Sequence, residues 1–139
     1  MEILHVPVAD ICSNPFTTLR ELTTGHWTGW LSYDAAAWTE PGTGSDFAAV
    51  TTKVTPTGAG WVLNGEKTWI INGRDAGLSI VYAQCGTLGD VKGIGAFLVD
   101  LRAPGVKRYA IDSSFAQTSM GTGGFFFENV ELAQNALLI

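Results

Sequence analysis

The pattern of apolar and polar positions changes near Trp27. From there on, short runs rich in β-branched and aromatic residues alternate with clusters of Gly, Pro, Asn and Asp, which is typical of strands separated by turns. We predict seven or eight strands, of which the clearest are Leu78–Gln84, Gly93–Asp100, Val106–Ile111 and Gly124–Leu132. Within the last run, Phe125-Phe126-Phe127 is expected to bury alternate rings and leave one facing outward.

Two hairpins are predicted among these runs. Asn64-Gly65 lies in the middle of Gly60–Ile70, and this dipeptide favours the two positive-φ positions of a type I′ turn. A longer hairpin is expected to join Ala48–Thr55 to the run that begins at Trp61, because the residues between them include Pro and Gly.

One short helix is predicted before the strands. Asn14 can cap a helix, Pro15 suits the first helical position, and Gly25 can end the helix, which predicts a helix over Pro15–Thr24. Residues 1–26 are therefore interpreted as a lead-in, and residues 27–139 as a β-domain.

The close spacing of the strands predicts the fold class. It leaves no room for helical crossovers between consecutive strands, so the sheet is expected to be antiparallel. The predicted fold is mainly β, an antiparallel barrel or sandwich of seven or eight strands in one domain. The composition agrees, because 46% hydrophobic residues are too many for a disordered chain and seventeen glycines too many for a helical bundle.

Charge and cysteine content argue against several functional classes. The formal net charge is −5 and the eight basic residues are scattered, so no basic stripe is available to bind a nucleic-acid backbone. Cys12 and Cys85 lack the spacing of zinc ligands, which favours two free thiols. The sequence contains neither a membrane-length apolar run nor a signal-peptide pattern, so a cytoplasmic location is expected.

Two segments carry the candidate chemistry. The first is Thr39–Asp46, with the sequence Thr-Glu-Pro-Gly-Thr-Gly-Ser-Asp, and the second is Leu63–Gly73, with the sequence Leu-Asn-Gly-Glu-Lys-Thr-Trp-Ile-Ile-Asn-Gly. A Gly-x-Gly loop alone is compatible with an ordinary turn. The two segments together closely resemble the middle-domain signature of the acyl-CoA dehydrogenase family. The resemblance continues in register from about Leu19 to Leu138.

The resemblance implies a site for the flavin of FAD. In the family, the position of Thr39 binds the pyrimidine edge through its backbone and hydroxyl, and the position of Trp69 packs beside the ring. Ser45 matches a serine that contacts the acyl-CoA ligand. The predicted cofactor-contacting residues are Ala37, Trp38, Thr39, Gly44, Ser45, Trp69, Ile70 and Ile71.

The chain departs from the family pattern at the flavin edge. Trp38 replaces a medium-sized aliphatic residue, and its ring is large enough to occupy space that a cofactor needs. Ile71 replaces a threonine or serine that can hydrogen-bond flavin N5. The family's catalytic glutamate belongs to a C-terminal helical domain, which is expected to begin where this chain ends. No acidic residue of this chain is therefore assigned as the base.

Three functional hypotheses follow. The first is a flavoprotein middle domain that binds FAD and an acyl thioester and takes part in α,β-dehydrogenation with partner helical domains. The second is a cofactor-free β-barrel that binds a hydrophobic small molecule, for example as a cyclase or isomerase. The third is a non-catalytic interaction module. An exposed apolar patch is expected, which a homodimer or a helical-domain partner chain would cover.

Overall fold

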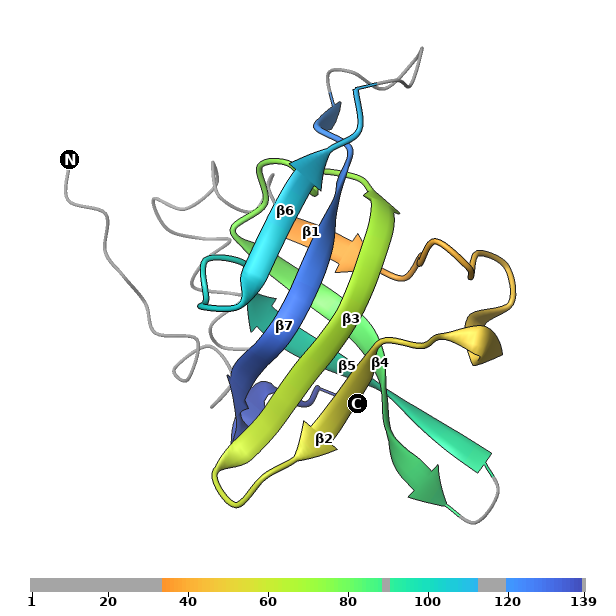
Figure 1. Ribbon diagram of the computed structural model, residues 1–139, viewed down its shortest axis with the longest axis vertical. Helices are drawn as coiled ribbons and strands as arrows, with labels where there is room; N and C mark the ends of the chain where they lie inside the picture. Colours follow the sequence, from red (N-terminus) through yellow and green to blue (C-terminus); the bar gives the residue numbers. More distant parts are fainter. Residues whose placement is uncertain (1–33, 89–90, 113–119, 139) are drawn as a thin grey trace, which may run out of the picture.

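A computed structural model describes residues 34–88, 91–112 and 120–138, and strands dominate this part of the chain (Figure 1). The strands are β1 (Asp34–Ala37), β2 (Lys53–Pro56), β3 (Gly60–Ile70), β4 (Leu78–Leu88), β5 (Val91–Asp100), β6 (Val106–Ala110) and β7 (Gly123–Ala133). Short 3₁₀ turns lie at Phe47–Ala49 and Gln134–Ala136. The predicted mainly β class and strand count are confirmed, whereas the predicted helix Pro15–Thr24 and the lead-in 1–26 lie outside the described residues.

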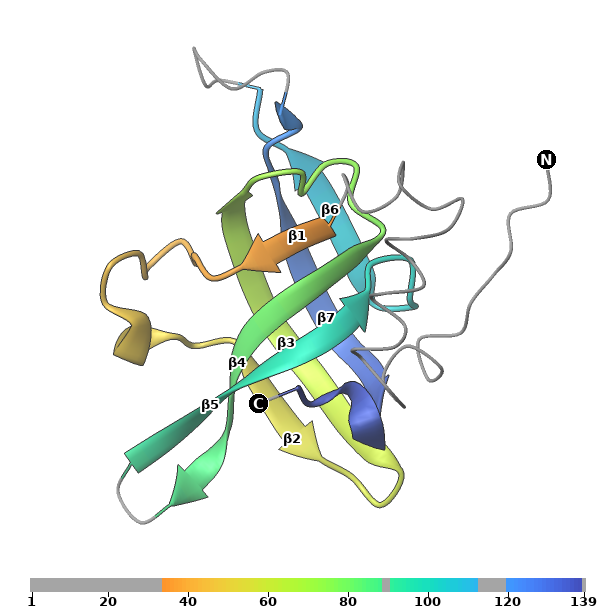
Figure 2. The same cartoon turned by 180° about the vertical axis from the view of Figure 1, so that it is seen from behind.

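The sheet is mixed rather than purely antiparallel. Its order is β1–β4–β2–β3–β7–β6, and β5 pairs with β4. Strands β6, β7, β3 and β2 form one layer, and β1, β4 and β5 lie behind it (Figures 1 and 2). The antiparallel prediction is wrong for the pairing of β2 with β4, where Lys53 is opposite Gln84, and for that of β1, which runs parallel to β4 with Asp34 opposite Leu78. The β2–β3 hairpin and its flanking loops connect these two strands, so the long return that a parallel pair needs is made without a helix.

The barrel is not closed. Strand β6 lies at one end of the path and pairs only with β7 among the described strands. At this edge the Arg108 guanidinium donates hydrogen bonds to the carbonyls of Arg74 (3.2 Å), Ala76 (3.0 Å) and Leu101 (3.0 Å). Three backbone carbonyls from the segments next to β4 and β5 therefore contact one side chain of β6, which links the layers where no strand pairing does.

The predicted hairpin at Asn64-Gly65 is wrong, because β3 runs straight through this dipeptide. Gly65 has φ 142°, and the register of β3 against β7 shifts between Leu63 and Gly65. A β-carbon on Gly65 would lie 2.7 Å from Cα of Thr52, so only glycine fits this bulge. The longer hairpin, from β2 into β3, is confirmed, although its first strand begins at Lys53 rather than at Ala48, which lies in the 3₁₀ turn. The hairpin turn is closed by the Thr57 N–H, which donates to the Gly60 carbonyl at 2.8 Å.

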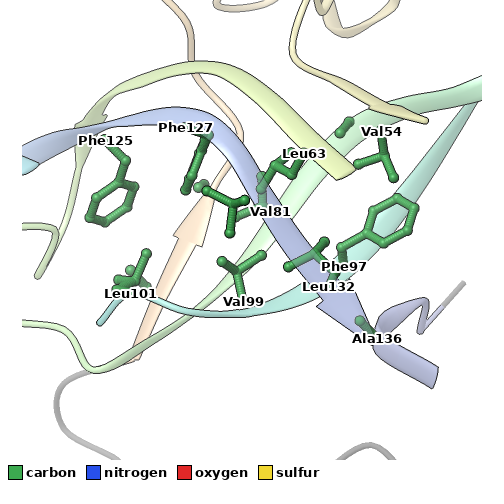
Figure 3. Packing of buried hydrophobic residues seen from close by; sticks show 14 of the residues in the cluster. Val54, Leu63, Val81, Phe97, Val99, Leu101, Phe125, Phe127, Leu132 and Ala136 are labelled. Carbon is green, nitrogen blue, oxygen red and sulfur yellow. The ribbon is translucent and has the colours of Figure 1, made fainter. Parts of the chain in front are cut away.

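The hydrophobic core lies between the two layers (Figure 3). Phe125 and Phe127 of β7 are buried while Phe126 between them is 40% exposed, as the alternation predicts. Phe97 of β5 is fully buried and meets Trp61 edge-on, with ring centroids 5.6 Å apart. Each large apolar side chain buried here contributes roughly 1.5–3 kcal/mol to folding. The core thereby holds β3, β4 and β7, the strands around which the loops are arranged.

Two further predictions concern features other than the sheet. Cys85 is a free, half-buried thiol, as expected, whereas Cys12 lies outside the described residues. Within the described part of the chain, no helix is long and apolar enough to cross a membrane. The same residues contain no group of three side chains suited to hold a metal ion.

Candidate functional site

The two motif segments meet at the end of β1. The segment between β1 and β2 projects from the side of the sheet and then returns to it (Figures 1 and 2). At its start, the Thr68 N–H donates to the Thr39 carbonyl at 2.9 Å. This bond places Thr39, from the first motif, beside the Thr68–Trp69 stretch of the second motif.

A buried ion pair joins the same two segments. The Lys67 ammonium lies 2.9 Å from Oε1 of Glu40, and the exposed fractions of the two side chains are 0% and 3%. The Glu40 carboxylate also accepts hydrogen bonds from the Thr51 N–H (2.7 Å), the Thr51 hydroxyl (2.6 Å) and the Thr52 N–H (2.9 Å). Four donors therefore surround one buried carboxylate, which is the arrangement that keeps such a group charged.

The titration of Glu40 reflects these contacts. Burial alone would raise the pKa of the carboxyl group, but hydrogen bonds from Thr51, Thr52 and Lys67 outweigh it and lower the pKa to about 2. Burial also lowers the pKa of the Lys67 ammonium, and Glu40 opposes that shift. The pair is therefore an ionised contact inside the protein rather than a surface ion pair.

The Lys67 ammonium also fixes the direction of the peptide group before Thr39. It donates a hydrogen bond to the Trp38 carbonyl at 3.1 Å. The described residues contain no cis peptide bond, so the Thr39 N–H points opposite to the Trp38 carbonyl and hence away from Lys67. The Thr39 carbonyl is bonded to the Thr68 N–H, so the carbonyls of Trp38 and Thr39 both face β3. The Thr39 N–H faces away from Lys67.

The chain bulges at Trp69. This residue has φ 57°, and the pairing of β3 with β7 shifts between Lys67 and Ile70. A positive φ is unfavourable for a bulky residue, and bulges often redirect side chains beside functional sites. Here Trp69 is 55% exposed, whereas Ile70 returns to the core at 2%. Only Trp69 of these two side chains is available to a ligand at the surface.

The turn after β3 presents a second apolar side chain. Ile71 is 45% exposed, and the next residue, Asn72, donates its N–H to the Met120 carbonyl at 3.0 Å. Arg74 donates its N–H to the Gly121 carbonyl at 2.8 Å. Met120 is itself 42% exposed, so the turn brings another apolar side chain to the end of the sheet where Ile71 lies. Sequence reasoning did not assign Met120 to the site.

Trp38 lies against the second layer. Its ring stacks on Tyr82 of β4 with centroids 3.7 Å apart and an interplanar angle of 25°. Phe47, from the projecting loop, is 4.9 Å from the same ring. Trp38 nevertheless stays 45% exposed. Trp38, one of the two departures from the family pattern, therefore belongs to a three-ring cluster at the edge of the site, and sequence reasoning identified neither Tyr82 nor Phe47 as its partner.

The other predicted site residues have different surroundings. Ala37 is fully buried and belongs to the hydrophobic core, so neither its side chain nor its backbone is exposed to a ligand in this structure. Gly44 and Ser45 are exposed on the projecting loop, and the Ser45 carbonyl accepts the Phe47 N–H at 3.1 Å. A β-carbon on Gly44 would meet no atom within 4 Å, so no close backbone contact in this structure requires glycine there. The assignment of these residues to cofactor or substrate binding stays a prediction.

Sequence reasoning also missed the Glu40–Lys67 pair, although both residues belong to the motifs. The signal was present, because the first motif carries the acidic residues Glu40 and Asp46 and the second carries Lys67 beside Glu66, in a chain with only 15% charged residues. Such a pattern indicates a pairing but gives neither the distance nor the burial, which depend on how the projecting loop returns to the sheet.

Comparisons with known proteins identify the family of the chain. Residues 35–130, more than half of the chain, match the family model for the acyl-CoA dehydrogenase middle domain. The mitochondrial short-chain specific acyl-CoA dehydrogenase of Rattus norvegicus is 35% identical over 102 residues, which cover 73% of this chain and 25% of that protein. The glutaryl-CoA dehydrogenase of Desulfococcus multivorans is 35% identical over 72% of this chain and 26% of its own length.

Solved structures give the same result. The acyl-CoA dehydrogenase of Geobacillus kaustophilus superposes with a TM-score of 0.69 and 32% identity, over 76% of this chain and 28% of that one. A glutaryl-CoA dehydrogenase of Mycobacterium smegmatis in complex with FADH2 gives a TM-score of 0.70 and 28% identity, over 87% and 33% of the two chains. The chain spans about a quarter of the length of the curated relatives it matches. It therefore belongs to the acyl-CoA dehydrogenase family, of which it contains the middle domain.

Proposed function

We propose that this chain forms the flavin-facing wall of an FAD-dependent acyl-CoA dehydrogenase and works together with helical domains. The observation that carries the proposal is the contact of Trp38 and Thr39 with Lys67 and Thr68, which leaves two exposed rings beside Thr39: Trp38, which precedes it in the chain, and Trp69, which follows Thr68. The relatives named above, one of them solved with FADH2, support it.

The residues present fit a planar group with a polar edge. The pyrimidine edge of a flavin carries carbonyl oxygens, which accept hydrogen bonds. The Thr39 N–H faces away from Lys67, and the Thr39 hydroxyl adds a second potential donor, so this segment suits such an edge. Trp69 offers an exposed ring for the apolar part of the group. FAD, when bound, supplies the hydride acceptor for oxidation of a C–C bond.

The remaining roles are divided between this chain and its partners. Ser45 on the exposed loop is proposed to contact the acyl thioester. Ile71 provides no hydroxyl, so any contact from it to flavin N5 is made by its backbone. The general base is proposed to come from a helical domain that packs against this one, and a homodimer or a helical-domain partner chain is proposed to cover the exposed apolar surface. A cytoplasmic location is proposed with it.

A second candidate function is a cofactor-free domain that binds a hydrophobic small molecule. The stack of Trp38 on Tyr82, with Phe47 beside it, favours this alternative. Three rings packed next to Thr39 reduce the open space at the flavin edge and offer an apolar surface of their own. The two candidates therefore make opposite predictions for replacement of Trp38.

A flavin titration of the purified full chain separates the candidates. We expect the chain to quench FAD fluorescence and to shift the visible flavin spectrum, and Thr39→Val to weaken binding about tenfold through loss of one hydrogen bond. Trp38→Leu with Ile71→Thr should strengthen binding, because it opens space and restores a hydroxyl. The matched control is Phe126→Leu, which removes a ring of 40% exposure from the outer face of β7 and should leave binding unchanged.

The flavin-wall proposal would be contradicted if neither the native chain nor the Trp38→Leu/Ile71→Thr variant binds FAD. Binding of a fluorescent apolar probe that is lost in Trp38→Leu but kept in Phe126→Leu would then support the second candidate.

A further inference from the structure

Lys67 contacts both sequence neighbours of Thr39. Its ammonium donates to the Trp38 carbonyl at 3.1 Å and to the Glu40 carboxylate at 2.9 Å. We infer that the Glu40–Lys67 pair is a positioning device, which holds the peptide group between Trp38 and Thr39 so that the Thr39 N–H faces the ligand. This inference rests on the proposed function, because it specifies how that function's central contact is oriented.

The saturation of the Glu40 carboxylate explains how the pair can hold a loop in place. Oε1 accepts from Lys67 and from the Thr52 N–H, and Oε2 accepts from the N–H and the hydroxyl of Thr51. The carboxylate therefore ties the start of the projecting segment to its end. The segment cannot slide along β3 without breaking several charge-assisted hydrogen bonds in a buried place.

The backbone on both sides supports the same geometry. Glu40 and Thr43 exchange backbone hydrogen bonds of 2.9 and 3.0 Å, so the turn after Glu40 is closed on itself. The Thr39 carbonyl is held by the Thr68 N–H. With its own carbonyl and both neighbours fixed, Thr39 retains one direction for its N–H, and that direction is set by Lys67 through the Trp38 carbonyl.

Stability alone does not account for a pair of this kind. Removing two charges from water is costly, and replacing a buried ion pair by apolar residues of similar volume is often neutral or stabilising. What apolar residues cannot supply is a donor for the Trp38 carbonyl and an acceptor for the Thr51 and Thr52 amides. The pair therefore contributes a specific arrangement of the loop, of the kind on which preorganised sites depend.

The test compares two double variants of the full, ¹⁵N-labelled chain. Glu40→Gln/Lys67→Met removes the ion pair without leaving a buried unpaired charge. Lys107→Met/Glu128→Gln is the matched control, because it removes a pair of the same chemistry that joins β6 to β7 at 2.8 Å with both side chains more than half exposed. Two measurements are made on each variant: the amide spectrum of the ligand-free chain and the affinity for FAD.

We expect the first variant to shift the Thr39 and Thr68 amide resonances. The Thr68 amide should also exchange with solvent about tenfold faster, relative to amides in the middle of β3, as expected for loss of one hydrogen bond. FAD binding should weaken about tenfold as well. The control should change neither readout. A role in stability alone would raise exchange throughout the sheet to the same extent, with no excess at the Thr68 amide.

Unchanged Thr39 and Thr68 amides in the folded Glu40→Gln/Lys67→Met variant would overturn the inference. Should that variant not fold, Glu40→Asp, which keeps both charges but shortens the acidic side chain by one methylene, gives the same two readouts and decides in the same way. Because the amide measurement needs no ligand, it decides the positioning role even where the native chain fails to bind FAD. Failure of the proposed function and failure of this inference are thus separate outcomes.

Discussion

Two lysine–glutamate pairs of nearly equal length lie in the same sheet, and their lysines are almost level along it, because Lys67 of β3 is opposite Phe125 of β7 and Lys107 of β6 is opposite Phe126. Lys67 and Glu40 lie 2.9 Å apart with side chains 0% and 3% exposed, whereas Lys107 and Glu128 lie 2.8 Å apart at 65% and 61%. The first pair lies near the end of β3 that meets Gly123, the first residue of β7. Glu128 lies further along β7 and lines an open acidic hollow together with Ala103, Pro104, Gly105, Asn129 and Glu131.

The difference between these regions lies in what surrounds the charges. Around Glu40, water has been replaced by fixed protein donors, so the loop that carries them must adopt one conformation. Around Glu128, water competes with Lys107 for the same oxygen atoms, so the pair restrains little. The distance between the lysine nitrogen and the carboxylate oxygen therefore says little about the structural role of an ion pair. Burial and additional hydrogen bonds determine that role.

The largest expected difference between the two ion pairs is in the stability lost when the lysine of each pair is replaced. Lys67→Met leaves the Glu40 carboxylate buried without its counter-charge, and we expect a loss of about 3–5 kcal/mol in the free energy of unfolding. Lys107→Met should cost less than about 1 kcal/mol, because its pair is exposed. Urea denaturation of both variants measures the two values.

Salt provides the control for this prediction. Added NaCl should reduce the small effect of Lys107→Met, because exposed charges are screened, and should leave the effect of Lys67→Met nearly unchanged. Equal losses in the two variants would show that burial does not distinguish the pairs.

Acid should also separate the two regions. The pKa of Glu40 falls from 4.5 to about 2 on folding, so ionised Glu40 stabilises the folded state above the higher value. A group whose folded pKa is lowered loses its contribution as pH falls through this window, and protonation below about pH 2 removes about 3 kcal/mol. Unfolding free energies measured by urea between pH 6 and about pH 2 should therefore decline, in a way that Glu40→Gln flattens.

Glu128→Gln is the control for the acid experiment. Its side chain is 61% exposed, so the variant should decline with pH like the native chain. A native-like decline in Glu40→Gln would mean that another carboxylate carries the acid sensitivity.

Most of the sheet could be predicted from the sequence because its signals are local. β-branched runs and turn residues predicted the strands at Leu78, Gly93, Val106 and Gly124 within a few residues of where they lie. The parallel pairing of β1 with β4 could not be predicted in this way, because it depends on where a long connection returns. Strand order is a property of the whole chain rather than of any one run.

The site was predicted to a similar extent. The motifs identified Thr39 and Trp69, which the structure brings close together through Thr68. They did not reveal that Ile70 points into the core, or that Trp38 stacks on Tyr82. Those outcomes depend on the bulge at Trp69 and on packing between layers, and neither leaves a local signal in the sequence.

The smallest expected effect concerns Gly65. This residue lies directly against Thr52, whose N–H donates a hydrogen bond to the Glu40 carboxylate. Gly65→Ala would place a β-carbon 2.7 Å from the Thr52 Cα at φ 142°, a conformation that L-residues rarely adopt. We expect a loss of about 1–3 kcal/mol, measured by urea denaturation. Gly58→Ala, in the open turn before β3 with no atom within 4 Å, should change stability little. If Gly65→Ala also shifts the Thr39 amide resonance and Gly58→Ala does not, then the bulge at Gly65 helps to hold the Glu40–Lys67 pair in place. A stable Gly65→Ala chain with a native spectrum would instead show that the hydrogen bonds to the Glu40 carboxylate hold the projecting segment without the bulge.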